Sequence, residues 1–266
     1  MKEMGVIGFD LEIAEPFPNE GWDRKAPLGV SCAATYSENP KYQRIFYPAL
    51  DGDRYKDRMS EEEVKDMLRV LLSFEGEDNH IVTWNGLGFD FLVLYLETED
   101  PMFRKLIRKM AMRHIDPYFA MFCDKGYGIG LQKAAESLGL SGKLEGMHGS
   151  LAPLMWNAEF EILSPEDASE ISAMGLTRGS KEAQDLCIKY VVQDARTTYD
   201  VYNGIFIKGA FYWITRSGSM SRYPWVPRKK YNRLLTCEEA NQTPEPNTSW
   251  MDSPRPRSDV IGWIFA

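Results

Sequence analysis

The chain has 266 residues, of which 44% are hydrophobic and 26% are charged. A chain of this length can bury a sizeable core without disulfide or metal crosslinks, and its composition excludes a membrane-embedded or disordered protein. The net charge of −8 argues against a protein that coats nucleic acid through bulk electrostatic attraction.

The sequence contains no recognisable targeting or membrane-spanning segment. Residues 1–8 lack the basic start and cleavage site of a signal peptide, and no window approaches 18 uninterrupted apolar residues. The four cysteines lie at least 50 residues apart, which excludes a CxxC metal or redox motif. We therefore expect a cytoplasmic protein with buried, reduced cysteines and no membrane partner.

The first part of the chain predicts strands followed by a helix. Apolar runs rich in β-forming residues predict a three-stranded meander at 4–13, 28–36 and 44–47. Ser60 and Glu63 then form a capping-box pattern ahead of apolar residues at helical spacing, so a helix is expected to about residue 74.

Strand and helix patterns alternate in the next part of the chain. A short apolar strand at 81–84 precedes an Asn-Gly turn, and Asp100-Pro101 is typical of a helix start. The other expected elements are a buried helix at 89–96, a short strand at 114–116, helices at 131–140 and from 164, and a long helix at 181–207. Because proline, serine and asparagine become frequent after residue 209, we expect one α/β domain over 1–208 and an irregular, basic, proline-rich extension over 209–266 packed on it.

Two carboxylates stand at the end of the first predicted strand. Asp10 and Glu12 alternate with Phe9, Leu11 and Ile13, so both acidic side chains leave the same face of the strand. Strand ends often carry stray acids, and by themselves these two residues are compatible with that simpler interpretation.

Two more carboxylates fall at positions expected to be buried. Asp90 begins a strongly apolar helix, where an acid can also serve the helix dipole. Asp194 lies on the apolar stripe of the long helix, one turn after Tyr190. A carboxylate on a core-facing stripe is costly unless it is paired or bound to a cation, although a hydrogen bond to Tyr190 would also satisfy it.

Four carboxylates brought together repel one another unless cations neutralise them. Oxygen ligands of this kind suit Mg²⁺ or Mn²⁺, and two such ions about 4 Å apart stabilise both the attacking and the leaving oxygen in phosphodiester hydrolysis. The four acids therefore predict a two-metal centre.

Three segments that contain these acids resemble the motifs of a known family. They are FDLE at 9–12, NGLGFD at 85–90 and YVVQD at 190–194, and they resemble, in order, the three motifs of the DEDD 3′-to-5′ exonuclease superfamily. The tyrosine four residues before the last aspartate is similar to that of the Tyr-type branch, and the likeness is closest to the proofreading domain of family B DNA polymerases. No polymerase domain follows.

The resemblance implies an RNase H-like fold with a mixed five-stranded sheet flanked by helices. It also implies that Asp10 bridges two metal ions, that Glu12 and Asp194 help to hold the first ion, and that Asp90 acts on the second through water. Tyr190 would position the attacking water. A tyrosine with a pKa near 10 is a poor base at neutral pH, which favours orientation over proton abstraction.

Substrate contacts are expected in two places. The resemblance suggests that Asn85 touches the terminal nucleotide. The segment 201–237 carries seven basic residues and no acidic one, so it has a charge of +7 and the rest of the chain −15. Its aromatic residues and the cations Arg222, Arg228, Lys229 and Lys230 suit phosphate contact and base stacking, whereas a basic arm paired with the acidic body is the alternative.

The sequence thus predicts a metal-dependent 3′-to-5′ exonuclease that acts on a free 3′ end, with single-stranded DNA as the expected substrate and DNA repair or processing as the expected context. Two alternatives stay open: a catalytically silent nucleic-acid-binding or adaptor module of the same fold, and an RNase H-like endonuclease.

Overall fold

The computed structural model describes residues 5–18, 22, 24–77, 79–162, 164–215, 218–224 and 233–265. Its strands are β1 (Val6–Ile13), β2 (Val30–Tyr36), β3 (Arg44–Phe46), β4 (Leu50–Asp51), β5 (Arg54–Tyr55), β6 (His80–Val82), β7 (Ala210–Ile214) and β8 (Met220–Pro224). Its helices are α1 (Glu61–Gly76), α2 (Asp90–Leu96), α3 (Pro101–Arg113), α4 (Pro117–Lys125), α5 (Leu131–Ser137), α6 (Leu151–Trp156), α7 (Pro165–Met174), α8 (Lys181–Lys208), α9 (Cys237–Asn241) and α10 (Ser258–Phe265), with a 3-10 turn at Pro40–Tyr42.

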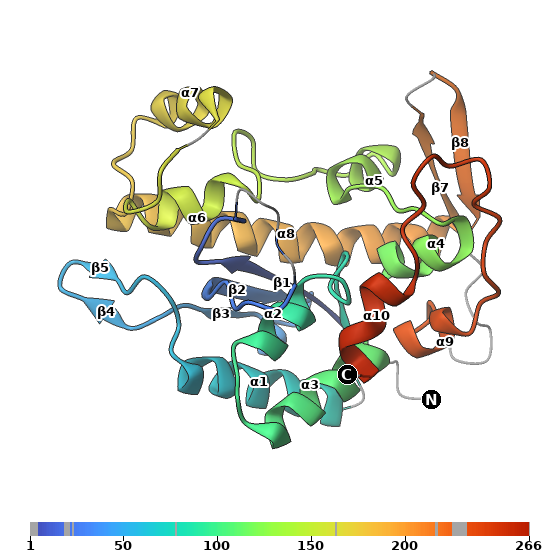
Figure 1. Cartoon of the computed structure of the whole chain (residues 1–266), viewed down its shortest axis with the longest axis horizontal. Coiled ribbons are helices and arrows are strands. Elements are labelled where there is room, and N and C mark those ends of the chain that lie inside the picture. Colours follow the sequence, from blue (N-terminus) through green and yellow to red (C-terminus); the bar gives the residue numbers. More distant parts are fainter. Residues whose placement is uncertain are drawn as a thin grey trace.

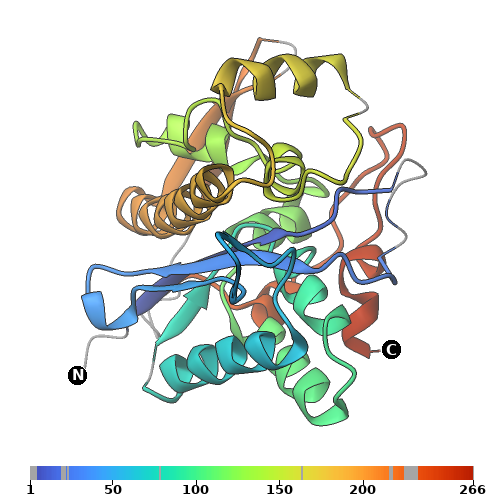
Figure 2. The same cartoon turned by 90° about the vertical axis from the view of Figure 1, so that its left-hand side faces the viewer.

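A mixed sheet in the order β3-β2-β1-β6 forms the centre of the molecule. β1 and β2 run antiparallel, as do β2 and β3, whereas β1 and β6 run parallel. Helix α8 lies across one face of the sheet, and α1, α2 and α3 lie on the other side (Figures 1 and 2). This α/β arrangement, with helices on both sides of a mixed sheet, is the RNase H-like fold expected from the sequence.

The sheet has four strands among the described residues, where five were expected. Val82 makes one parallel bridge to Ile115, so the predicted strand at 114–116 is reduced to a single pair. The reason is that Asp116 already caps α4 and Pro117 occupies its first turn. The chain therefore turns into a helix before a strand can extend.

Several local signals fold as predicted. Ser60 and Glu63 form the capping box of α1, and Asp100 caps α3 with Pro101 in its first turn. The long helix α8 ends at Gly209, whose left-handed backbone with φ of 67° closes it. On β1, a Cβ at Gly8 would lie 2.2 Å from the carbonyl oxygen of Ala195. Glycine at this position therefore lets α8 lie directly against β1.

The C-terminal residues contain more regular structure than their composition predicts. After α8 the chain forms the antiparallel hairpin of β7 and β8, then α9 and α10. Phe211, Leu234 and Cys237 are fully buried and belong to the same hydrophobic cluster as the β1 side chains. The expected domain boundary between residues 208 and 209 coincides with the end of α8 and stays a prediction.

All four cysteines are buried free thiols, as expected. No helix in the described ranges has both the length and the apolar character needed to traverse a bilayer.

Candidate functional site

Asp10 and Glu12 leave β1 on the face that α8 covers. Opposite them on β2 lie Ala34 and Cys32, which are small and fully buried. Phe9 and Leu11 point to the other face and into the main core. Both carboxylates thus leave the same face of β1, as the sequence predicts, and enter the space between the sheet and α8.

Helix α8 supplies the opposite wall of this space. Tyr190 and Asp194 stand one turn apart on its buried face, with exposed fractions of 0% and 2%. Oxygens of Asp10, Glu12 and Asp194 lie within 4.8 Å of one another. These three residues, together with Asp90, are called the carboxylate centre below.

Asp90 is held against β1 by a backbone contact. It is the first residue of α2, and its Oδ1 accepts a hydrogen bond from the N–H of Leu11 at 3.1 Å. Leu11 lies between Asp10 and Glu12, so the fourth acid joins the other three. A cavity of about 180 Å³ is lined by the four acids, Asn85, Lys143 and Tyr190, among others.

Asn85 lies at the start of the turn that leads into α2. Its backbone is left-handed, with φ of 69°, a conformation that asparagine tolerates better than most residues. Its N–H donates to Oδ1 of Asp116 at 3.0 Å. Asn85 also lines the cavity that contains the carboxylate centre.

Lys143 is a site residue that the sequence analysis missed. Its ammonium donates to Oδ2 of Asp194 at 2.6 Å and to the hydroxyl of Tyr190 at 2.7 Å. Lys143 belongs to an irregular segment, where no hydrophobic periodicity indicates the direction of a side chain. Its position depends on Gln132, which accepts the Lys143 N–H at 2.7 Å, and on Gln193, which donates to the Gly142 carbonyl at 3.0 Å.

Burial makes ionisation of the carboxylate centre unfavourable. It raises the pKa of Asp10, and Asp90 and Asp194 raise it further. It also raises the pKa of Glu12 well above its usual value and the pKa of Asp90 to about 7. Burial likewise raises the pKa of Asp194, although Lys143 partly offsets the effect. The centre therefore gains from any further positive charge.

The donor set fits divalent cations. All four acids offer oxygen ligands, which suit Mg²⁺ and Mn²⁺. Oδ1 of Asp194 is buried and has no hydrogen-bond partner among the described residues, although buried polar atoms are normally satisfied. One ammonium group, that of Lys143, faces four acids. A buried carboxylate oxygen without a hydrogen-bond donor, in a site with excess negative charge, is typical of a metal ligand.

The predicted basic contacts do not all gather at this cavity. Arg222 lies on β8, where its Nε donates to the Tyr212 hydroxyl at 3.1 Å, and it does not line the cavity of the carboxylate centre. Arg228, Lys229 and Lys230 lie outside the described residues. Of the expected substrate contacts, the structure brings only Asn85 to the carboxylate centre in the described part of the chain.

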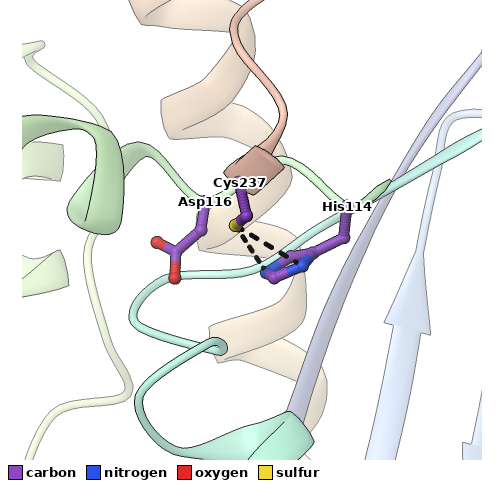
Figure 3. A group of neighbouring side chains, drawn as sticks. All are labelled: His114, Asp116 and Cys237. Atoms are coloured by element: carbon purple, nitrogen blue, oxygen red, sulfur yellow. Dashed lines mark hydrogen bonds between the residues drawn. The ribbon is translucent and has the colours of Figure 1, made fainter. Parts of the chain in front are cut away.

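A second group of metal-binding residue types lies elsewhere in the core (Figure 3). His114, Asp116 and Cys237, called the histidine cluster below, are all buried. Sγ of Cys237 lies 3.6 Å and 3.7 Å from the two ring nitrogens of His114, and one potential ligand atom of each of the three residues lies within 4.8 Å of the other two (Figure 3).

The fold and the acidic centre together define an α/β protein of the RNase H-like class. Residues 49–205 match the family model of the RNase H superfamily, and the chain belongs to that superfamily. The matched segment includes Asp90, Tyr190 and Asp194, whereas Asp10 and Glu12 precede it. A search of curated proteins found no match. Membership of this superfamily indicates a nuclease-type hydrolase that acts on nucleic acid, and such nucleases typically use divalent metals.

Proposed function

We propose that the protein is a metal-dependent 3′-to-5′ exonuclease that hydrolyses phosphodiester bonds at the free 3′ end of nucleic acid, with single-stranded DNA as its substrate. The observation that carries the proposal is the meeting of Asp10, Glu12, Asp90 and Asp194 with Tyr190 around one cavity. The three motifs that contain these residues resemble those of Tyr-type DEDD exonucleases, and this resemblance supports the direction of degradation.

In this mechanism the four carboxylates would hold two divalent ions, either Mg²⁺ or Mn²⁺. When bound, such ions would stabilise the charge that develops on the phosphate and would favour deprotonation of water at neutral pH. The side chains would fix the positions of the ions, because their own positions are fixed by β1, by the Leu11 N–H and by α8.

Tyr190 orients the attacking water and does not remove its proton. Burial, together with the negative charge of Glu12, raises the pKa of the phenol above its usual value. The hydroxyl consequently stays protonated at neutral pH and can act as a hydrogen-bond donor. Lys143, which donates to that hydroxyl, fixes its direction.

The test uses oligonucleotides of DNA and RNA, labelled at the 5′ or the 3′ end, with Mn²⁺ or with EDTA. We expect immediate release of the 3′ label as a mononucleotide, gradual shortening of the 5′-labelled strand, and no reaction in EDTA. A chain terminated by a 3′ phosphate or closed into a circle should resist degradation.

Each alternative gives a different result in the same assay. Cleavage of the circular substrate would identify an endonuclease. Binding without hydrolysis at any metal concentration would identify a silent nucleic-acid-binding module. Faster degradation of RNA than of DNA would overturn the choice of substrate and leave the reaction class unchanged.

A further inference from the structure

A second, larger cavity lies between α2, α10 and the segment that contains Arg24. Its volume is about 720 Å³, and none of the described residues lines both it and the cavity of the carboxylate centre. It is lined by Arg24, Lys25, Leu92, Tyr95, Leu96, Arg104, Arg255, Asp259, Gly262 and Trp263. Helices α2 and α10 also lie close together in both views of the molecule (Figures 1 and 2).

The charge of this cavity is opposite to that of the whole protein. Among the described residues that line it, four are cationic and one, Asp259, is acidic, whereas the chain carries a net charge of −8. Such a concentration of positive charge around a concave surface attracts anions. The groove beside the carboxylate centre contrasts with it, since the charged residues that line its described part are Glu15, Glu161 and Asp167.

Two arginines of the cavity oppose each other. Burial and the nearby charge of Arg255 lower the pKa of Arg24 to about 10, whereas Asp259 acts in the other direction. Arg255 donates to the carbonyl of Asp259 at 3.4 Å, so this contact does not neutralise its charge with a carboxylate. An anion between the two guanidinium groups would relieve their repulsion.

A third arginine and two aromatic rings form other walls of the cavity. The guanidinium of Arg104 lies over the ring of Tyr95 at 5.1 Å, and its Nε donates to the Thr98 carbonyl at 2.7 Å. The indole of Trp263 donates to the Leu87 carbonyl at 3.1 Å. Guanidinium groups bind phosphate through paired hydrogen bonds, and an indole can stack on a base.

We propose that this cavity binds a nucleotide, with its phosphate between Arg24 and Arg255 and its base beside Trp263. The nucleotide is either free in solution or part of a nucleic-acid strand, because both offer the same phosphate. Arg24 also donates to the Gly88 carbonyl at 2.7 Å, so the site adjoins the turn that precedes Asp90. The proposal does not require the protein to be an exonuclease.

Binding is measured by calorimetry in EDTA, where the acids of the carboxylate centre repel phosphate and hydrolysis does not interfere. The probes are deoxyadenosine monophosphate, deoxyadenosine, inorganic phosphate and a ten-residue oligothymidylate. We expect the monophosphate to bind at least about tenfold more tightly than the nucleoside, because the nucleoside lacks the charged group.

The decisive variants are Arg255→Gln and the double variant Lys25→Gln/Arg255→Gln. Both side chains are exposed, so neither change should disturb folding. Arg255→Gln should weaken monophosphate binding about tenfold, the loss expected for one charge-assisted hydrogen bond. The matched control is Arg69→Gln on α1, an exposed arginine outside the cavity, which should leave the affinity unchanged.

Two results would overturn the proposal. One is equal affinity of the wild type and the double variant for both the monophosphate and the oligonucleotide. The other is that neither the monophosphate nor the oligonucleotide binds the wild type at concentrations up to about 10 mM. If only the oligonucleotide distinguishes the double variant from the wild type, the phosphate belongs to a bound strand; if the monophosphate does so too, the cavity accepts a free nucleotide.

Discussion

The carboxylate centre and the histidine cluster both consist of residue types that can bind a metal, but they differ in how many of their polar atoms have hydrogen-bond partners. Asp116 accepts hydrogen bonds from the N–H groups of Asn85, Leu87 and Phe119, at 3.0 to 3.2 Å. Both ring nitrogens of His114 are also engaged, one with the Ala111 carbonyl and one with the Thr83 hydroxyl. In the carboxylate centre, by contrast, acids face acids, and Oδ1 of Asp194 has no hydrogen-bond partner in the part of the chain that the structure describes.

The comparison shows that unmet hydrogen-bonding capacity, rather than residue type, distinguishes a ligand site from a structural cluster. In the histidine cluster, burial lowers the pKa of His114 to about 3, so the imidazole is neutral and its donor and acceptor positions are both used. A metal would have to displace these bonds, whereas in the carboxylate centre it would complete the coordination of oxygens that otherwise repel.

The largest expected difference is in activity. Asp10→Asn and Asp194→Asn should each reduce hydrolysis by at least about 10³-fold, because each removes a charged ligand of the proposed metal centre, which would stabilise the transition state. The thermal unfolding midpoint in EDTA should not fall, since each change relieves repulsion among buried acids. Nucleotide release and circular dichroism check the two results, and wild-type rates in either variant would contradict the metal assignment.

Asp116→Ala should produce the opposite pattern, with a large loss of stability. Three backbone N–H groups lose their acceptor, and each unsatisfied buried donor costs about 1–3 kcal/mol. We expect the free energy of unfolding in urea to drop by roughly 3–5 kcal/mol. Asp116→Asn retains an acceptor oxygen and should lose less; equal stability of Asp116→Ala and wild type would contradict the structural role.

The stability of the folded protein should depend on pH through the raised pKa of Asp90 in the carboxylate centre. Asp90 has a pKa of about 7 in the folded protein against an ordinary 3.8, so the folded state binds its proton more tightly than the unfolded state does. The stability that this proton provides is therefore lost as the pH rises from about 4 to 7 without metal.

Comparison with Asp90→Asn isolates that contribution, because the amide does not titrate and can still accept the Leu11 N–H. As the pH rises from 4 to 7 in EDTA, the free energy of unfolding of the variant should increase relative to that of the wild type by up to about 4 kcal/mol. This figure corresponds to some three pKa units at about 1.36 kcal/mol each. Mn²⁺ should stabilise the wild type more strongly at pH 7 than at pH 5, since protons compete for the same oxygens. A constant difference across this range would refute the assignment.

The smallest expected change is that of Tyr190→Phe. The ring and its packing remain, and the hydroxyl that receives the Lys143 hydrogen bond is lost. Single-turnover rates should fall about 10- to 100-fold, or roughly 1.4–2.7 kcal/mol, while Mn²⁺ affinity changes little. An unchanged rate would assign Tyr190 to packing, and a large loss of metal affinity would make it part of the ligand set.

Much of the carboxylate centre could be predicted because its residues lie on regular elements. Alternation along β1 and the apolar stripe of α8 determine which faces carry Asp10, Glu12 and Asp194, and these periods are visible in the sequence. Lys143 could not be found in this way, because the hydrogen bonds of Gln132 and Gln193 fix its segment only after the chain has folded.

The fold was predicted well where capping signals mark an element and less well elsewhere. The prediction of a fifth strand was wrong, because Asp116 and Pro117 begin α4 directly after Ile115. Helix α10 was missed in a region rich in proline, since its buried Val260 and Ile264 depend on a surface supplied by the rest of the molecule. Tertiary contacts, absent from local sequence patterns, decide such segments.

The length of α8 constrains which insertions this protein can accept. Its 28 residues form one continuous helix of about 42 Å, with Tyr190 and Asp194 near the middle. One extra residue between Lys181 and Tyr190 would turn the preceding part of the helix by about 100° relative to the part that follows. Either the packing of Ala183 and Cys187 or the aim of the two site residues would be lost. Loops on either side of α8 can therefore vary in length, whereas the helix itself must keep its residue count.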